Sequence, residues 1–332
     1  MAKLKLTLAC GNYDRTRALM DGTIQPDGIE LNYLALTPGE TFWRMLNNEE
    51  FDVSEMSLST YTILRSQDDH RFIALPVFPS RVFRHSAIYI HSESGITKPQ
   101  ELKGGRIGVA DYQMTAAIWA RGILEHEYQV SAREVHWVVG APIHGGVNLP
   151  VQTPIEQITP DQSLETMLEK REIDALISVV IPKSFRAKNP LVKRLFPNHR
   201  EVETDYYRRT GIFPIMHTFV LKSELFHHEP WIAISLYKAF VQAKELNYRR
   251  LYDTTALAAS LPWVIDEIEA SRRIFGEDIW DYSIEGSRPT LEALVQYLDE
   301  QGLTRRRMKI EELFVPNIRP ELLHYLRATG EE

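Results

Sequence analysis

Short apolar runs alternate with amphipathic stretches through the first 140 residues of the chain. The apolar runs have the alternating or β-branched character of strands, and they lie at residues 3–9, 29–34, 51–54, 72–77, 87–91, 106–110 and 135–139. Stretches with apolar residues at helical spacing separate them, at residues 15–20, 39–46, 57–65 and 115–128. Because strands that alternate with helices are typical of a wound architecture, we predict an α/β fold.

The pattern changes at residue 140. Residues 140–161 carry several prolines and a glycine pair, which predicts a long loop or an extended insertion. Regular structure is predicted to resume as a helix, a buried strand, a second strand and a long helix, at residues 163–170, 174–180, 213–221 and 231–252. The remainder, to residue 328, predicts a mostly helical C-terminal region with a helix start at Arg288 and Pro289.

Composition and charge limit the class of protein. The chain has 332 residues, 44% of them hydrophobic and 25% charged, which is enough for two domains with sizeable cores. The formal charge is −7, and the arginines at 305–307 read as a solvated turn, so we predict no nucleic-acid partner. The single cysteine, Cys10, directly follows an apolar strand and is predicted to be buried rather than nucleophilic.

The amino-terminal residues bear on location. They alternate like a strand and lack the long apolar segment and the small-residue cleavage site of a secretion signal. No stretch approaches the ~20 apolar residues that a membrane span needs. We therefore expect a cytoplasmic protein with no membrane as a partner.

One strand-to-helix turn has the features of an anion site. Residues 106–110 predict a strand and residues 115–128 a helix, so Tyr112, Gln113 and Thr115 lie where the strand ends and the helix begins. The first N–H groups of a helix have no partner within it and the helix dipole is positive there, which favours a carboxylate or a phosphate. A plain helix start that binds nothing is the alternative.

Three parts of the chain together resemble the type II periplasmic-binding-protein superfamily. They are Lys-Pro-Gln-Glu-Leu-Lys-Gly at 98–104 with Arg-Ile-Gly-Val at 106–109, residues 164–176 ending in Glu-Ile-Asp-Ala-Leu, and residues 294–302. The resemblance spans most of the chain and implies two α/β lobes that close over a ligand in the cleft between them. It implies a first lobe of residues 1–106 and 214–332, and a second lobe of residues 107–213.

Four further motifs are similar to the 4,5-dihydroxyphthalate decarboxylase family. They are the segments at 13–22, 50–59, 78–86 and 208–218, which begin Tyr-Asp-Arg-Thr, Glu-Phe-Asp-Val, Phe-Pro-Ser-Arg and Arg-Arg-Thr-Gly. This resemblance implies a cytoplasmic carboxy-lyase of phthalate degradation, which converts a small aromatic dicarboxylate, 4,5-dihydroxyphthalate, to 3,4-dihydroxybenzoate and CO2. The alternative is a cytoplasmic binding protein that captures an aromatic or heteroaromatic acid unchanged, because both functions fit the same fold.

The implied reaction requires a general acid and a general base. The ring carbon that loses CO2 must accept a proton, and a hydroxyl group para to that carbon can push electrons into the ring if its own proton is removed. His85 and His217 are the predicted catalytic residues. His217 lies within a predicted strand, where an isolated histidine is more often a core residue, but the family fold would bring it to the floor of the cleft.

The carboxylate that the product keeps needs a positively charged clamp, and the planar fork of arginine matches its two oxygens. Hydroxyl groups and helix N–H groups at strand ends can add to that clamp. The predicted substrate-binding residues are Asp14, Arg15, Glu55, Ser57, Ser59, Arg81, Arg84, Tyr112, Gln113 and Thr115. Each has an ordinary structural alternative such as helix capping, and Glu55 is equally a candidate base or the partner of an arginine.

The sequence predicts no cofactor and no metal. The glycine pairs at 104–105 and 145–146 match neither a phosphate-binding loop nor a dinucleotide fingerprint. No two histidines have the spacing of a metal site, although a site assembled from His85, Glu55 and His217 stays open. A homo-oligomer is possible, since the helical C-terminal region offers apolar side chains that either pair two chains or pack on their own lobe.

Overall fold

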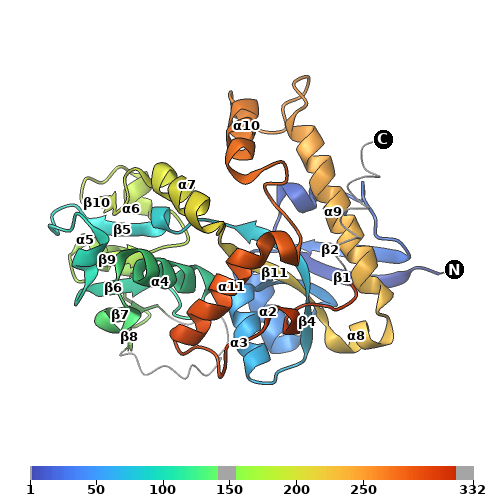
Figure 1. Ribbon diagram of the computed structural model, residues 1–332, viewed down its shortest axis with the longest axis horizontal. Coiled ribbons are helices and arrows are strands. Elements are labelled where there is room, and N and C mark those ends of the chain that lie inside the picture. Colours follow the sequence, from blue (N-terminus) through green and yellow to red (C-terminus); the bar gives the residue numbers. More distant parts are fainter. Residues whose placement is uncertain (1, 141–154, 319–332) are drawn as a thin grey trace.

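The computed structural model describes residues 2–140 and 155–318, and it shows two lobes, each built around one mixed β-sheet (Figure 1). The sheet of the first lobe has the strand order β2-β1-β3-β11-β4. Its strands are β1 (Leu4–Cys10), β2 (Ile29–Ala35), β3 (Val53–Ser57), β4 (Phe72–Arg81) and β11 (Ile215–Lys222). Strands β1, β2 and β3 are parallel, whereas β11 runs antiparallel to both of its neighbours, so the amino end of β11 lies at the carboxyl edge of β3.

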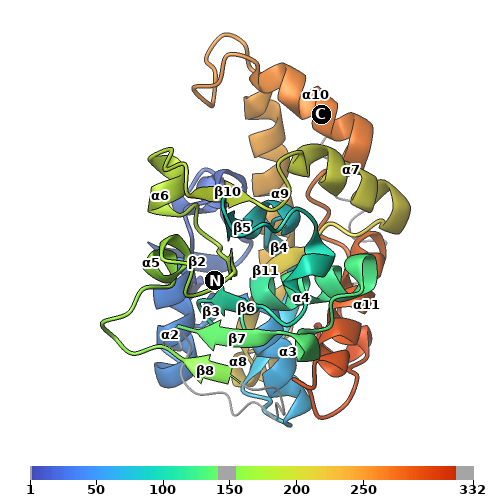
Figure 2. The same ribbon diagram turned by 90° about the vertical axis from the view of Figure 1, so that its left-hand side faces the viewer.

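The sheet of the second lobe has the order β10-β5-β9-β6-β7-β8. Its strands are β5 (Ile88–His91), β6 (Arg106–Val109), β7 (His136–Val139), β8 (Ile155–Gln157), β9 (Ala175–Ile177) and β10 (Val192–Arg194). The four strands from β9 to β8 are parallel, and β5 pairs antiparallel with β9 and with β10. Figure 2 shows β6, β7 and β8 side by side, with α5 and α6 on the side to which the β7 and β8 arrowheads point.

Helices cover both sheets. Those of the first lobe are η1 (Asp14–Thr16), α1 (Arg17–Met20), α2 (Pro38–Asn48), α3 (Leu58–Ser66), α8 (Ser223–His228), α9 (Trp231–Leu251), α10 (Val264–Phe275), α11 (Ile284–Glu300) and η5 (Ile310–Glu312). Those of the second are η2 (His85–Ala87), η3 (Pro99–Leu102), α4 (Thr115–Tyr128), η4 (Ala132–Glu134), α5 (Leu164–Glu169), α6 (Lys183–Arg186) and α7 (His199–Thr210). The end of α9 and all of α10 project from the top of the molecule as an arm (Figures 1 and 2).

The two crossings between the lobes are short. The first lies at residues 82–87, because β4 pairs in the first sheet and β5 in the second. The predicted boundary at residue 106 is therefore too late by one strand: the apolar run of β5 fits either sheet, and only its pairing with β9 and β10 assigns it to the second. The return crossing follows α7, which ends at Gly211 in the left-handed region (φ 68°), and leads into β11.

One large core joins the lobes. Buried side chains of the first sheet, such as Phe78, belong to the same cluster as Ile107 and Trp119 of the second lobe. Helix α4 makes this connection, since it packs on α3, α11 and β11, and its Trp119 indole donates a hydrogen bond to the carbonyl of Ile215 at 2.9 Å. A smaller cluster, which includes Leu176, fills the other face of the second sheet.

Three predicted elements differ from the structure. The strand predicted at 174–180 ends at Ile177, because the chain turns there and leaves Val179 and Val180 exposed. The last long helix begins at Ile284 rather than at Arg288, since the Ser283 hydroxyl caps it and Pro289 lies within it. Most of the loop predicted at 140–161 lies outside the described residues, but its final part contains β8.

Candidate active site

A carboxylate and an imidazole meet at the carboxyl edge of the first sheet. Glu55 stands on β3 and His217 near the start of β11, and Glu55 Oε1 lies 2.6 Å from His217 Nδ1. The Glu55 side chain is fully buried, whereas the His217 side chain keeps 19% of its surface exposed. The edge of Phe42 packs against the imidazole at 4.9 Å between ring centres. No described residue bonds to His217 Nε2, so the ring is anchored at one nitrogen and its other nitrogen is available to a ligand.

Two more donors complete the shell of Glu55. The Tyr13 hydroxyl donates to Oε1 at 2.6 Å, and the Gly11 N–H donates to Oε2 at 2.8 Å. Gly11 has to be small here, since a Cβ at this position would lie 2.9 Å from the Tyr13 ring and 3.4 Å from Oε2. Burial raises the pKa of Tyr13, and the Glu55 carboxylate raises it further, so the phenol keeps its proton and donates.

The hydrogen bonds keep Glu55 ionised. Burial alone raises the pKa of this carboxyl, but the hydrogen bond and charge interaction with His217 oppose it, and the bonds from Tyr13 and Gly11 add to that opposition. The net effect is a pKa below the ordinary value. An ionised carboxylate accepts from Nδ1–H, and it thereby fixes both the orientation and the tautomer of His217.

Irregular pairing of β11 with β4 shapes the strand around His217. The register shifts on both sides of His217: Ser80 and Leu75 are five positions apart in β4, but their partners in β11 are only two positions apart. Such bulges redirect side chains and release carbonyl groups from the ladder. The released Pro79 carbonyl accepts two hydrogen bonds from the Arg15 guanidinium, one of them at 2.7 Å from Nε.

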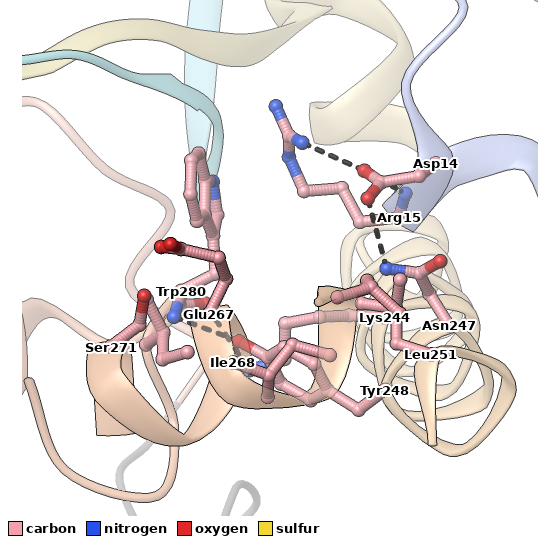
Figure 3. A pocket seen from close by; sticks show the side chains of 12 residues that line it. Asp14, Arg15, Lys244, Asn247, Tyr248, Leu251, Glu267, Ile268, Ser271 and Trp280 are labelled. Atoms are coloured by element: carbon pink, nitrogen blue, oxygen red, sulfur yellow. Dashed lines mark hydrogen bonds and ion pairs between the residues drawn. The ribbon is translucent and has the colours of Figure 1, made fainter. Parts of the chain in front are cut away.

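Arg15 is held between two aromatic rings. Its guanidinium lies 4.4 Å from the centre of the Tyr13 ring and 4.3 Å from that of Trp280. The Trp280 indole donates to the Phe78 carbonyl at 2.9 Å, and Asp14 accepts from Arg15 at 2.9 Å. Arg15 thus connects the histidine site with a second pocket of about 230 Å³ between η1, α9 and α10 (Figure 3).

Hydroxyl groups join the carboxyl edges of the two sheets. Ser59 lies at the start of α3 in the first lobe, and its hydroxyl donates to the Gln113 carbonyl of the second lobe at 2.8 Å. The Thr115 hydroxyl accepts from the Ser59 N–H at 3.1 Å and lies 3.0 Å from the Ser57 hydroxyl. Ser57 is in turn the residue paired with His217 across β3 and β11. The strand ends of both lobes therefore meet beside His217.

His85 lies in a different environment. It is 1% exposed and packs against the rings of Tyr128, Phe196 and Tyr206, with 5.3 Å between its ring centre and each of the last two. Neither ring nitrogen has a hydrogen-bond partner among the described residues. Burial lowers the pKa of His85 to about 4, with a contribution from Arg209, so the ring is neutral at pH 7. This placement does not support the predicted proton transfer by His85.

The two arginines predicted to clamp a carboxylate, Arg81 and Arg84, lie where the chain crosses between the lobes. Arg81, at the end of β4, donates to the Asp281 carbonyl at 2.7 Å and to the Ser287 hydroxyl at 2.6 Å. Arg84 is 7% exposed, and burial lowers its pKa to about 10, as it does for Arg81. Both side chains are enclosed by protein, which gives them a structural position between the lobes.

Tyr112 has a packing position as well. It is 2% exposed, and the buried Arg121 guanidinium stacks over its ring at 3.8 Å. The structure thus assembles Glu55, His217, Arg15 and the Ser57 hydroxyl near one edge, whereas Tyr112 is buried against Arg121. Asp14 faces the pocket between α9 and α10, where Asn247 donates to it at 3.2 Å.

The prediction missed Gly11 as a member of the site, whereas Tyr13 is one of the aromatic residues that the sequence offers for lining the pocket. The position of Gly11 directly after a strand, in the sequence Cys-Gly-Asn-Tyr, was the available signal, because the end of a parallel strand faces the crevice. Within the described residues, no three His, Cys, Asp or Glu side chains gather closely enough to hold a metal ion. In the same part of the chain, no helix has the length and apolar character of a membrane span.

Comparison with known proteins relates the chain to one group of enzymes. No family model matches it. A 4,5-dihydroxyphthalate decarboxylase from Comamonas testosteroni is 37% identical over 322 residues, which make up 95% of this chain and 98% of that protein. A protein of the same name from Pseudomonas putida is 38% identical over 214 residues, which make up 63% of this chain and 83% of that protein.

Solved structures identify the fold. The periplasmic aliphatic sulphonate binding protein SsuA from Escherichia coli matches with a TM-score of 0.56 and 11% identity, over 96% of this chain and 94% of that one. The desulfurization enzyme DSZB matches with a TM-score of 0.51 and 13% identity, over 99% of this chain and 100% of that one. These matches confirm the predicted two-lobed fold of the type II periplasmic-binding-protein kind.

Proposed function

Because the chain belongs to the 4,5-dihydroxyphthalate decarboxylase family, we propose that it removes one carboxylate of 4,5-dihydroxyphthalate as CO2 and forms 3,4-dihydroxybenzoate. The observation that carries the chemical assignment is the 2.6 Å hydrogen bond between Glu55 and His217 at the sheet edge. Such a pair provides an oriented imidazole, which can serve as the general acid that protonation of a ring carbon requires.

His217 is the proposed general acid. With both ring nitrogens protonated, His217 is a cation beside the Glu55 carboxylate, and its Nε2–H gives a proton to the ring carbon that carries the departing carboxylate. The carbon–carbon bond to that carboxylate then breaks. The bonding electrons return to the ring, CO2 leaves, and His217 takes a new proton from solvent. The net change replaces one carboxylate by hydrogen. Glu55 is a positioning residue in this scheme, since it holds Nδ1, and Tyr13 in turn holds Glu55.

Positive potential favours the dianionic substrate at this edge. The Arg15 guanidinium lies against the ring of Tyr13, and 14% of its side chain is exposed. The amino ends of α3 and α4 meet through Ser59 and Thr115, so the positive ends of two helix dipoles point to the same region. A hollow of about 380 Å³ is lined by Gly11, Tyr13 and the start of α2. These groups support binding of the carboxylate that the product keeps.

Location and assembly are part of the same proposal. We place the enzyme in the cytoplasm, which suits a soluble aromatic diacid as substrate.

The arm formed by α9 and α10 exposes Leu257, Leu261 and Trp263 by 52%, 58% and 72%. Helix α10 is acidic in its first turn and basic in its last, so two copies would be complementary in an antiparallel pair. A homo-oligomer through this arm is the proposal, and Trp263→Glu should lower the mass measured by light scattering.

The decisive experiment is turnover by the purified, chelator-treated protein. We expect CO2 release from 4,5-dihydroxyphthalate together with an equal amount of 3,4-dihydroxybenzoate, and loss of both with His217→Asn. A matched control is His227→Asn, which alters an exposed histidine at the end of α8.

Two other results would change the proposal. Tight binding of intact 4,5-dihydroxyphthalate without turnover would favour the binding-protein alternative. Turnover that appears only after a divalent metal is added would require a metal-dependent mechanism in place of proton transfer by His217 alone.

A further inference from the structure

The second lobe has its own pocket at the carboxyl edge of its sheet. The pocket measures about 370 Å³ and extends across the ends of β6, β7 and β9. It is lined by Ala110, Gly140, Ile158, Gln162, Ser163, Leu164, Glu165, Leu176, Ile177, Ser178, Val180 and Pro182. Among these described residues, Glu165 is the single ionisable side chain, and none carries a positive charge.

Only one of the two Glu165 carboxylate oxygens has hydrogen-bond partners among the described residues. Its Oε1 accepts from the Ser184 N–H at 2.6 Å and from the Ser184 hydroxyl at 2.9 Å. No described residue bonds to Oε2. A carboxylate without a neighbouring cation repels a second carboxylate, but it accepts strongly from a phenolic hydroxyl. The polar end of this pocket therefore suits a hydroxyl group and disfavours an acid.

An exposed apolar run borders the same pocket. Val179, Val180 and Ile181 follow β9 and are exposed by 49%, 70% and 50%, although the predicted buried strand extended to residue 180. A hydrogen bond of 2.6 Å from the Ser178 hydroxyl to the Val180 carbonyl stabilises the turn that presents them. Consecutive exposed aliphatic side chains beside a carboxylate form a surface that fits an aromatic ring with a polar edge.

This pocket adjoins the strand ends that meet beside Glu55 and His217. Its Ala110 directly follows β6, and Gln113, three residues later, accepts the hydrogen bond from Ser59 of the first lobe. The Thr115 hydroxyl lies 3.0 Å from the hydroxyl of Ser57, and Ser57 is the cross-strand neighbour of His217. A ring held between the two sheet edges would thus have the first lobe at one side and the Glu165 pocket at the other.

We propose that the second-lobe pocket binds the hydroxyl-bearing edge of the substrate ring, with Glu165 Oε2 accepting from a ring hydroxyl and Val180 against the ring. This inference rests on the proposed decarboxylation. It orients the two carboxylates away from Glu165 and toward Arg15 and His217. The class of ligand is an aromatic acid with adjacent hydroxyl groups on the ring edge opposite its carboxylates.

Glu165 then also serves as the general base. The O–H bond of the hydroxyl para to the reacting carbon breaks, its proton moves to Oε2, and the oxygen electron pair delocalises into the ring. That carbon takes the proton from His217, the carboxylate leaves as CO2, and the phenolic oxygen recovers its proton from Glu165. One proton from solvent is consumed overall, which balances the loss of CO2 from an ionised carboxylate.

The test compares ligands with and without hydroxyl groups. Calorimetric titration would give the affinities of phthalate and of 3,4-dihydroxybenzoate for the wild type, Glu165→Gln and Glu169→Gln. Glu169 is the matched control, because it lies one turn further along α5 and outside the pocket. We expect Glu165→Gln to weaken 3,4-dihydroxybenzoate roughly tenfold or more relative to phthalate, and Glu169→Gln to leave the ratio unchanged.

Kinetics separate this inference from the proposed function. With 4,5-dihydroxyphthalate, Glu165→Gln should lower kcat by roughly 100-fold, which is typical of a lost general base. An active wild type with an equally active Glu165→Gln, or an equal loss of affinity for both ligands, would overturn the inference and leave the decarboxylation intact. An inactive wild type would instead overturn the decarboxylation, while the two affinities still show whether the pocket recognises hydroxyl groups.

Val180 tests the apolar part of the pocket. Val180→Ser should weaken phthalate and 3,4-dihydroxybenzoate by a similar factor, roughly threefold to tenfold, because it removes apolar cover from the ring but no hydroxyl partner. Ile155→Ser, an exposed aliphatic position on β8 of the same lobe, should change neither affinity. Unchanged binding in Val180→Ser would remove the ring contact from the proposal.

Discussion

The regions around His217 and His85 show how differently one residue type behaves in a single chain. His217 has a buried carboxylate 2.6 Å from Nδ1 and keeps 19% of its side chain exposed. His85 is enclosed by three aromatic rings, is 1% exposed, and has no hydrogen-bond partner among the described residues. His217 lies near the start of β11, and His85 lies in η2 within the first crossing, so the chemistry of each is set by what the fold places around it.

Burial and a hydrogen-bond partner act in opposite directions in these two regions. Burial without a partner lowers the pKa of His85 to about 4 and keeps the ring neutral and inert. Glu55 is equally buried, but its hydrogen bonds outweigh the burial and lower its pKa, which keeps it charged. A site that moves protons needs the second arrangement, in which a fixed charge orients a group that still reaches solvent.

Replacing each histidine by a residue that does not ionise should give the largest difference in kcat between the two regions. His217→Asn should lower kcat for 4,5-dihydroxyphthalate by roughly 1,000-fold, since it removes the proposed general acid. His85→Phe, which matches the aromatic enclosure, should leave kcat within about threefold, a change worth less than 1 kcal/mol. Steady-state kinetics of both variants provide the measurement. Equal losses in the two variants would remove the distinction between the regions.

Removing the charge of Glu55 should have the next largest effect. Glu55→Gln should lower kcat roughly tenfold to 100-fold through a misplaced imidazole. It should also lower the free energy of unfolding by about 3 kcal/mol, because it breaks a buried pair. Glu30→Gln on β2 is the control, since that side chain is 59% exposed. Urea titrations and kinetics measure both effects, and a fully active Glu55→Gln would contradict the positioning role.

Acid should destabilise the two regions in separate pH windows. His85 has an ordinary pKa of 6.5 when unfolded and about 4 when folded, so its stability contribution is present above pH 6.5 and is lost as pH falls toward 4. A shift of that size corresponds to roughly 3 kcal/mol. The pKa of Glu55 is lowered from 4.5, so its contribution is lost only below pH 4.5. His85→Phe should therefore flatten the unfolding free energy between pH 6.5 and 4.5, which chemical denaturation at several pH values would measure.

The hydroxyl contact between the sheet edges should give the smallest effect. Thr115→Val removes the hydroxyl that accepts from the Ser59 N–H, and should lower the free energy of unfolding by about 1 kcal/mol. Thr204→Val on α7 is the control, because the Thr204 hydroxyl bonds within its own helix. If the rise in KM, converted to a free energy, exceeds the loss in the free energy of unfolding, the contact also places His217 for the substrate.

Local patterns were sufficient for most of the secondary structure. Helix α4 spans the predicted residues 115–128, and α9 ends one residue before its predicted end, because their apolar spacing has one period throughout. The β9 region was predicted less well, since an apolar run indicates burial whether the chain turns or continues. Val179 and Val180 are apolar and exposed, which periodicity alone does not anticipate.

Residue types and their local spacing were enough to establish the α/β alternation, the buried cysteine and the set of residues from which a site could be built. These features can be read along the chain because each depends on near neighbours. Tertiary contacts were needed to establish that Glu55 meets His217 rather than an arginine, that Arg81 and Arg84 lie enclosed at the crossings, and that β5 belongs to the second sheet. Strand order and bulges bring together residues more than 100 positions apart, and no local pattern encodes which of several similar edges will pair.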